Sequence, residues 1–259
     1  MQILVIGDIV GRPGRQLVQR LLPELREKYS PALVIANGEN AAGGAGITPP
    51  IARELFGYGI DVLTSGNHIW DKKEIIPYFD QEERLIRPEN YPPGTPGRGW
   101  VVVRSASGIP VAVTNFAGRT FMDNLECPFR RADALLAHLQ EETRIILVDF
   151  HAEATSEKQA FGWYLDGRVS AVFGTHTHVQ TADERILTKG TGYITDIGMT
   201  GPAEGIIGVE RETVIKRFLT QMPQRFYPAR GPGELNGILL EIDEVTGTSL
   251  GIRRITECG

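Results

Sequence analysis

The sequence predicts an α/β domain in which parallel strands alternate with helices and two hairpins add antiparallel strands. Three observations carry this prediction. Short apolar runs alternate with amphipathic stretches, as in βαβ units whose strands are buried on both faces. Two pairs of strand-like runs are joined by short turns, which favours hairpins. Polar residues that can bind metal ions follow strand after strand. The periodicity does not reveal the number of sheets.

The strand–helix alternation is clearest in the N-terminal part. Residues 2–7 form a β-branched run that is too short for a helix. Pro13 can then open a helix at its first position, and leucines recur after it at helical spacing. The runs 32–38 and 61–66 repeat the strand pattern on either side of an expected helix at 49–59.

Hairpins are expected later in the chain. The runs 99–105 and 109–116 are joined by a short Ser/Gly turn, and 237–255 reads as a second hairpin that turns at Thr246-Gly247. Between the two hairpins, 144–150 and 169–174 resume the pattern of buried strands.

The Pro/Gly-rich stretch 87–99 is the best candidate for a linker between domains. Strand-like runs of the same character lie on both sides of it, so we interpret it as a surface loop. We therefore expect residues 1–259 to form a single domain.

The composition argues against several classes of function and location. A net charge of −5 argues against binding along an extended nucleic acid, which needs a broad basic surface. Cys127 and Cys258 are far apart and imply no disulfide framework, as in a reducing compartment. The N-terminus has no basic lead-in of a signal sequence, and no apolar stretch reaches the length of a membrane helix. We expect a cytoplasmic protein without a membrane partner.

Five successive strand ends carry candidate metal ligands. In open α/β sheets, ligands bind beyond the carboxyl ends of the strands. Oxygen and nitrogen donors without thiolate suit Mn, Fe, Zn or Co. The residues at these ends are Asp8, Glu39, Asn40, Asn67, His68, His151, His176 and His178.

Most of these residues, taken alone, also have an ordinary structural explanation; His68, for example, could be a satisfied polar residue in a turn. Asp8 alone could cap the next helix, and Glu39 with Asn40 could be solvated loop residues. A single His151 is more often a buried, hydrogen-bonded imidazole than a ligand. The spacing of His176 and His178 is stronger, because imidazoles at i and i+2 of an extended segment can face one ion. Four of the five histidines fall at strand ends, which makes coincidence the poorer explanation; His138, in an amphipathic helix, is assigned to the surface.

The ordered motifs GD, GEN, GNH, DFH and GTHTH resemble those of the calcineurin-like metallophosphoesterases, and in detail the YmdB-like branch. They span about two-thirds of the chain. The resemblance implies a four-layer α/β/β/α sandwich with two mixed sheets and two divalent metal ions per chain, with Fe or Mn favoured over Zn, Co and Mg. Residue by residue, it gives one metal the ligands Asp8, Glu39 and His178 and the other the ligands Asn67, His151 and His176, with Glu39 bridging.

Two further residues receive roles from the resemblance. His68 would contact the phosphoryl group and help the leaving oxygen depart, as a catalytic residue that binds substrate. Asn40 would donate a hydrogen bond to the phosphate. Two departures from the general superfamily match the YmdB-like branch. Val10 stands where the first motif, Asp-x-His, has its histidine, and Glu39 stands where the second motif has a bridging Asp.

The resemblance implies a phosphodiesterase that opens 2′,3′-cyclic nucleotides by attack of a metal-bridging hydroxide. A small cyclic nucleotide or another phosphodiester is therefore the expected partner, and a homo-oligomer is compatible with the sequence. Three alternatives remain open: a phosphomonoesterase or protein phosphatase, a nuclease, and a non-catalytic regulatory protein that binds metal. The physiological substrate, the native metal and the biological pathway are not specified by the sequence.

Overall fold

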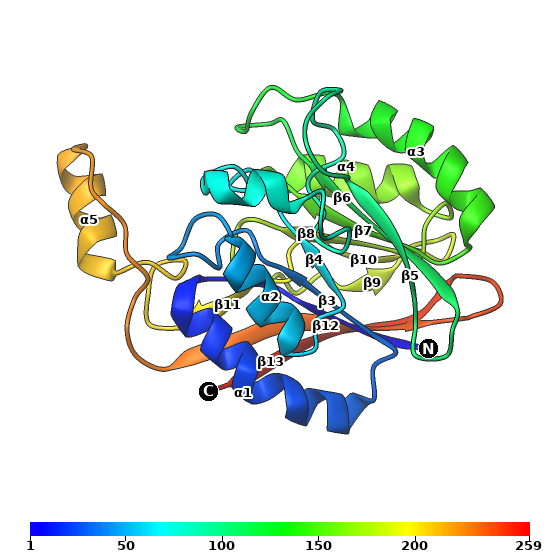
Figure 1. The fold of residues 1–259 in the computed structure, drawn as a ribbon, viewed down its shortest axis with the longest axis horizontal. Coiled ribbons are helices and arrows are strands. Elements are labelled where there is room, and N and C mark those ends of the chain that lie inside the picture. Colours follow the sequence, from blue (N-terminus) through cyan, green and yellow to red (C-terminus); the bar gives the residue numbers. More distant parts are fainter.

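The computed structural model describes residues 1–259 and arranges two mixed β-sheets face to face between two layers of helices (Figure 1). The first sheet has the order β2 (Asp8–Ile9), β11 (Met199–Pro202), β12 (Gly233–Ile242), β1 (Gln2–Ile6), β3 (Leu33–Asn37) and β4 (Val62–Thr64), with β13 (Ser249–Cys258) beside β12. The second has the order β5 (Trp100–Arg104), β6 (Pro110–Ala117), β7 (Ile146–His151), β8 (Ala171–Thr175), β10 (Gly192–Ile194) and β9 (Arg185–Ile186). The expected α/β/β/α sandwich with two mixed sheets is confirmed.

Helices cover the outer face of each sheet (Figure 1). The first sheet carries α1 (Gly11–Tyr29) and α2 (Pro49–Gly57), and the second carries α3 (Pro128–Glu142) and α4 (Thr155–Leu165). A short 3₁₀ helix, η1 (Lys73–Tyr78), follows β4, and α5 (Arg211–Thr220) projects from the body of the molecule. None of the helices combines the length and apolar character that a membrane crossing requires.

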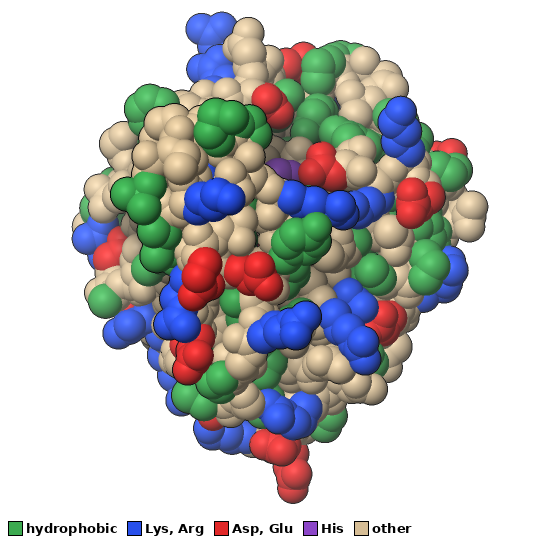
Figure 2. Space-filling view, turned by 90° about the vertical axis from the view of Figure 1, so that its left-hand side faces the viewer, with side chains coloured by type: hydrophobic (Ala, Val, Ile, Leu, Met, Phe, Trp, Pro, Cys, Tyr) green, Lys and Arg blue, Asp and Glu red, His purple; other side chains and the backbone are tan.

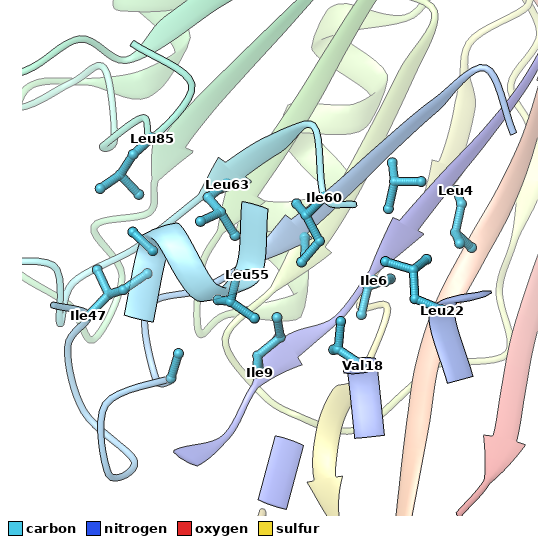
Figure 3. Close-up of a cluster of buried hydrophobic side chains, with 14 of the residues drawn as sticks. Leu4, Ile6, Ile9, Val18, Leu22, Ile47, Leu55, Ile60, Leu63 and Leu85 are labelled. Carbon is cyan, nitrogen blue, oxygen red and sulfur yellow. The ribbon is translucent and has the colours of Figure 1, made fainter. Parts of the chain in front are cut away.

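The strands are apolar on both faces because each sheet packs on both sides. In β1, Leu4 and Ile6 point towards α1 and meet Leu22 there (Figure 3). The alternate residues Ile3 and Val5 point between the two sheets. Burying each such side chain stabilises the fold by about 1.5–3 kcal/mol. A continuous apolar run in a strand therefore signals burial on two sides, as the sequence suggested.

Most predicted elements agree with the structure. The pairs β5–β6 and β12–β13 are antiparallel, so both hairpins are confirmed. The first helix begins at Gly11, two residues earlier than predicted; Pro13 still lies in the first turn, where an amide has no helical partner. The stretch 87–99 is a loop, but residues 87–90 are buried rather than on the surface. His138 is exposed on α3, as expected.

The parallel strands direct the site to one edge of the sandwich. In the first sheet β1, β3 and β4 are parallel, and in the second β6, β7, β8 and β10 are parallel. Parallel neighbours end at the same side of a sheet, so the residues that follow them converge. The short strands β2 and β11 were not predicted, and they extend the first sheet at this edge.

Candidate metal centre

The residues after five strands meet around one pocket of about 520 Å³, which some of them line. Figure 2 looks at this edge of the molecule and shows histidine surface at the bottom of a hollow, with hydrophobic side chains beside it. Glu39, Asn40, His176 and His178 line the pocket, with His68 at its side. Asp8 and His151 lie behind them and are fully buried. The structure thus brings together the side chains that the sequence singled out.

Glycines allow this close approach. A Cβ atom at Gly66 would lie 2.2 Å from Nε2 of His151 and 2.4 Å from Oε2 of Glu39. At Gly7 it would lie 2.0 Å from the carbonyl oxygen of Gly198. A side chain at Gly66 would push His151 and Glu39 apart, and one at Gly7 would clash with the backbone of Gly198, so glycine is required at both positions.

Glu39 lies at the centre of the donor groups. Its Oε1 is 3.2 Å from Nε2 of His151 and accepts a hydrogen bond of 3.1 Å from Nδ2 of Asn40. Its Oε2 accepts one of 3.1 Å from the backbone amide of His68. Burial opposes ionisation, but attraction to the His151 imidazolium outweighs it, and the pKa of Glu39 falls to about 2. Glu39 therefore carries a negative charge at the centre of the donor groups.

A hydrogen-bonded chain orients His151. The hydroxyl of Thr175 donates to Oδ1 of Asp149 at 2.6 Å, so it accepts from Nδ1 of His151 at 2.9 Å. This leaves Nε2 facing the cluster, 3.0 Å from Oδ1 of Asn67. Burial disfavours the charged ring, but Glu39 and then Asp8 outweigh it and raise the pKa of His151 to about 9. A cation bound here would take the place of that proton.

His176 and His178 face different groups rather than one. Both have a positive φ, 95° and 66°, so the segment turns sharply after β8 instead of staying extended as expected. Nδ1 of His176 lies 3.0 Å from Nε2 of His151, and its Nε2 lies 3.2 Å from Oε2 of Glu153. Burial and then the charge on His151 lower the pKa of His176 to about 3, so this ring is neutral.

The ring of His178 is also oriented by a hydrogen bond to one of its nitrogens. Nδ1 lies 2.9 Å from the carbonyl oxygen of Ile207, which can only accept, so Nδ1 donates. Nε2 is then an acceptor, 3.2 Å from Nδ2 of Asn40, and it lies 3.9 Å from Oδ1 of Asp8. All three strand-end histidines of the cluster thus have one ring nitrogen bonded outward and the other facing inward, as metal-binding histidines do.

Two buried oxygens in the cluster have no hydrogen-bond partner: Oδ1 of Asp8 and Oδ1 of Asn40. An unpaired buried oxygen is costly, and burial raises the pKa of Asp8 to about 7. A cation would supply the missing partner. One ligand atom from each of Glu39, His151 and His176 also lies within 4.8 Å of the others. Carboxylate, amide and imidazole donors without thiolate suit divalent transition metals, so the donor set fits them.

His68 and Asn40 occupy different environments. Apart from its backbone amide, His68 stays outside the cluster; its side chain is 39% exposed, and Nδ1 lies 2.9 Å from Oδ2 of Asp71. Asn40 is buried, and its Nδ2 contacts both Glu39 and His178. The amide hydrogens that would bind phosphate are therefore engaged within the cluster, and the role of Asn40 stays a prediction.

Several supporting residues were missed by the sequence analysis. Asp149 stands two residues before His151, on the same face of a strand, and that spacing could have revealed it. Glu153 lies two residues after His151 and could have been noticed for the same proximity. Lys158 and Asp196 form a buried ion pair at 2.6 Å, and Asp196 also accepts a 3.1 Å hydrogen bond from the backbone of Thr177. No local pattern connects this pair.

The sandwich and the convergent donors define a metallophosphoesterase. A match to the model of a family described as YmdB-like protein covers residues 4–255. The chain belongs to the YmdB-like family.

Individual relatives cover nearly the whole chain. A 2′,3′-cyclic-nucleotide 2′-phosphodiesterase of Bacillus subtilis is 55% identical over 98% of this chain and 96% of its own. A hypothetical protein from Thermus thermophilus has a crystal structure with a TM-score of 0.93 at 46% identity, covering 100% of this chain and 99% of the other. A crystal structure described as a novel phosphatase of Mycoplasma pneumoniae also has a TM-score of 0.93, at 33% identity, covering 100% and 93%.

Proposed function

We propose that the protein is a divalent-metal-dependent phosphodiesterase that hydrolyses 2′,3′-cyclic nucleotides. The observation that carries the proposal is the arrangement of three histidines, each bonded outward through one ring nitrogen and facing the cluster with the other. The name of the Bacillus subtilis relative, 55% identical over nearly the whole chain, supports the substrate class.

The donor groups suggest two cation positions that share Glu39. Two divalent cations, with Fe or Mn favoured over Zn, Co and Mg, would polarise the phosphoryl oxygens and lower the pKa of water at the site. The residues proposed for one position are Asn67, His151 and His176, and those for the other are Asp8 and His178.

His68 is the proposed proton donor to the leaving ribose oxygen. The Asp71 carboxylate accepts from Nδ1, which fixes the ring and leaves Nε2 free for substrate. As an imidazolium, His68 would also neutralise charge on the phosphoryl oxygens. Asn40 is proposed to donate to the phosphate once cations engage Glu39 and His178 and release its amide hydrogens.

The proposal also covers the domain organisation, the cellular location and the assembly of the enzyme. Residues 1–259 would act as one metallophosphoesterase domain. Both cysteines are free, which supports a cytoplasmic location. A symmetric homo-oligomer is compatible with the sequence.

The first test is hydrolysis of 2′,3′-cyclic AMP by metal-stripped protein with and without Mn²⁺, beside 3′-AMP and p-nitrophenyl phosphate. We expect Mn²⁺-dependent opening of the cyclic diester, with both monoesters left largely intact. Preferential cleavage of the monoesters would instead establish a phosphomonoesterase, the alternative that the description of the Mycoplasma pneumoniae structure favours. Metal binding without turnover of any compound would point to a regulatory protein.

A further inference from the structure

The pocket above the donor cluster has an apolar wall that the proposed chemistry does not use. We name it the aromatic wall; it consists of Ile207, Val209, Phe226, Tyr227 and Pro228. The residues Phe226 and Tyr227 are 40% and 46% exposed. Exposed aromatic side chains beside a polar site favour contact with an apolar or aromatic group of a ligand.

Backbone hydrogen bonds hold the aromatic wall in place. The amide of Glu210 donates to the carbonyl of Tyr227 at 3.1 Å, and the amide of Ala229 donates to the carbonyl of Gly208 at 2.9 Å. Val209 and Pro228 form the antiparallel bridge between these bonds. Two segments about twenty residues apart in the chain thus form a short ribbon, with the wall residues on it.

The wall is also tied to the proposed metal ligands. Ile207, a β-branched residue, has a positive φ of 47°, a conformation that it rarely adopts. This backbone geometry places its carbonyl oxygen 2.9 Å from Nδ1 of His178. The hydrogen bond fixes the wall relative to the donor cluster.

The chemistry of a 2′,3′-cyclic nucleotide calls for such a surface. The base is attached to C1′, the carbon next to C2′, which carries one of the phosphate oxygens. The base and the cyclic phosphate lie on opposite faces of the ribose. When the phosphate is bound at the donor cluster, the base therefore points away from it, towards the outer part of the same pocket.

We propose that the aromatic wall is the nucleobase subsite of this pocket, with Tyr227 as the residue on which the base stacks. The inference rests on the proposed function and deepens it. Of the two aromatic residues in the wall, Tyr227 lines the site pocket alone, whereas Phe226 also lines a second groove beside α5. Stacking does not distinguish base edges, so the subsite accepts all four bases.

A neighbouring apolar residue outside the site pocket can serve as a control. It tests whether the effect belongs to the base subsite or to the apolar surface in general. An adjoining groove between the wall and α5 is lined by Phe218, which is 73% exposed, and shares Ile207, Val209 and Phe226 with the wall. Tyr227 lines the site pocket but not the groove. Phe218 lines the groove but not the pocket, so Phe218→Ala is a matched control.

The test compares Tyr227→Ala, Tyr227→Phe and Phe218→Ala on two substrates, 2′,3′-cyclic AMP and methyl β-D-ribofuranoside 2′,3′-cyclic phosphate, which has no base. Loss of one stacking contact should raise KM for 2′,3′-cyclic AMP about tenfold in Tyr227→Ala, with kcat little changed. Tyr227→Phe keeps the ring and should behave like the original chain, as should Phe218→Ala. KM for the base-free substrate should be the same in all variants.

Adenosine binding gives a readout that is independent of turnover. Its dissociation constant, measured by NMR titration of metal-stripped protein, should rise about tenfold in Tyr227→Ala and stay unchanged in Phe218→Ala. Equal adenosine affinity in Tyr227→Ala and the original chain would overturn the subsite, even if cyclic phosphates are hydrolysed. Hydrolysis of neither cyclic phosphate, with adenosine binding still dependent on Tyr227, would instead overturn the proposed function and leave the base site standing.

Discussion

Glu39 divides the donor cluster into two unlike halves. In the partnered half, formed by Asn67, His151 and His176, every side chain has a hydrogen-bond partner. In the unpartnered half, formed by Asp8, Asn40 and His178, two buried oxygens have none.

The residue at position 10 leaves the unpartnered half with fewer ligand groups. Val10 lines the pocket where the general superfamily motif would place an imidazole. A cation in the unpartnered half would thus have fewer protein ligands. Two cation positions that would share one carboxylate therefore need not bind with equal strength. We expect tight binding in the partnered half and weaker, more exchangeable binding in the other.

Removing the shared charge should affect both halves and have the largest effect. In Glu39→Gln, the neutral amide cannot bridge two cations, so we expect kcat for 2′,3′-cyclic AMP to fall by at least about a thousandfold. Metal content, measured by inductively coupled plasma mass spectrometry, should fall from two ions per chain to below one. Glu27→Gln, on the exposed side of α1, is the control and should change neither quantity. Full metal content in Glu39→Gln would remove the bridging assignment.

Replacing His68 should slow the chemistry while leaving both halves intact. Loss of a general acid costs about a hundredfold to ten-thousandfold, so kcat of His68→Ala should fall within that range. Metal content should stay unchanged, because only the backbone amide of His68 touches the cluster. His138→Ala, which removes the exposed histidine of α3, is the matched control. If His68→Ala loses metal, the residue is a ligand or supports one, and the assignment as proton donor fails.

The partnered half shows how far the sequence could predict the site. His151 and Asn67 follow apolar runs, and a run that is buried on both faces predicts both the strand and the edge at which it ends. The succession of these buried strands along the chain followed from periodicity, and the convergence of their ends followed from the polar residues placed there. The resemblance supplied the four-layer arrangement, which periodicity alone leaves open.

Other features depend on contacts between distant segments. The pairing of β2 with β11 joins Asp8 to Met199, and runs of two and four residues are too short to show a period. The groups that orient the histidines come from unrelated positions, such as the carbonyl of Ile207. The positive φ of His176 and His178 also contradicted the expectation of an extended segment, because the turn is imposed by tertiary contacts.

Breaking the hydrogen-bonded chain behind His151 should weaken the partnered half selectively. Thr175→Val removes the hydroxyl between His151 and Asp149, so the ring loses its fixed orientation. Loss of such supporting groups typically costs about 10–100-fold in metal affinity. Isothermal titration of metal-stripped protein with Mn²⁺ should show the tighter of two binding events weakened by that factor. Leaving buried groups unpaired should also lower the free energy of unfolding by about 1–3 kcal/mol.

The control for this variant is Thr191→Val, which removes another buried hydroxyl, one bonded to the carbonyl of Val169 away from the cluster. It should lower stability without changing Mn²⁺ affinity. Equal losses of affinity in both variants would show that Thr175 acts through general stability rather than through His151.

Adding a metal ligand to the unpartnered half should bring its Mn²⁺ affinity closer to that of the partnered half. Val10 lines the pocket and is buried at the start of α1, after the strand that carries Asp8. In Val10→His, an imidazole could join Asp8 and His178, and the weaker Mn²⁺ site should tighten about tenfold while the tighter site keeps its affinity. Val10→Ala offers no donor and serves as the control for altered packing. If both variants change the weaker site alike, packing rather than ligand number sets its affinity. If Val10→His alone tightens it, the missing imidazole explains why the halves differ.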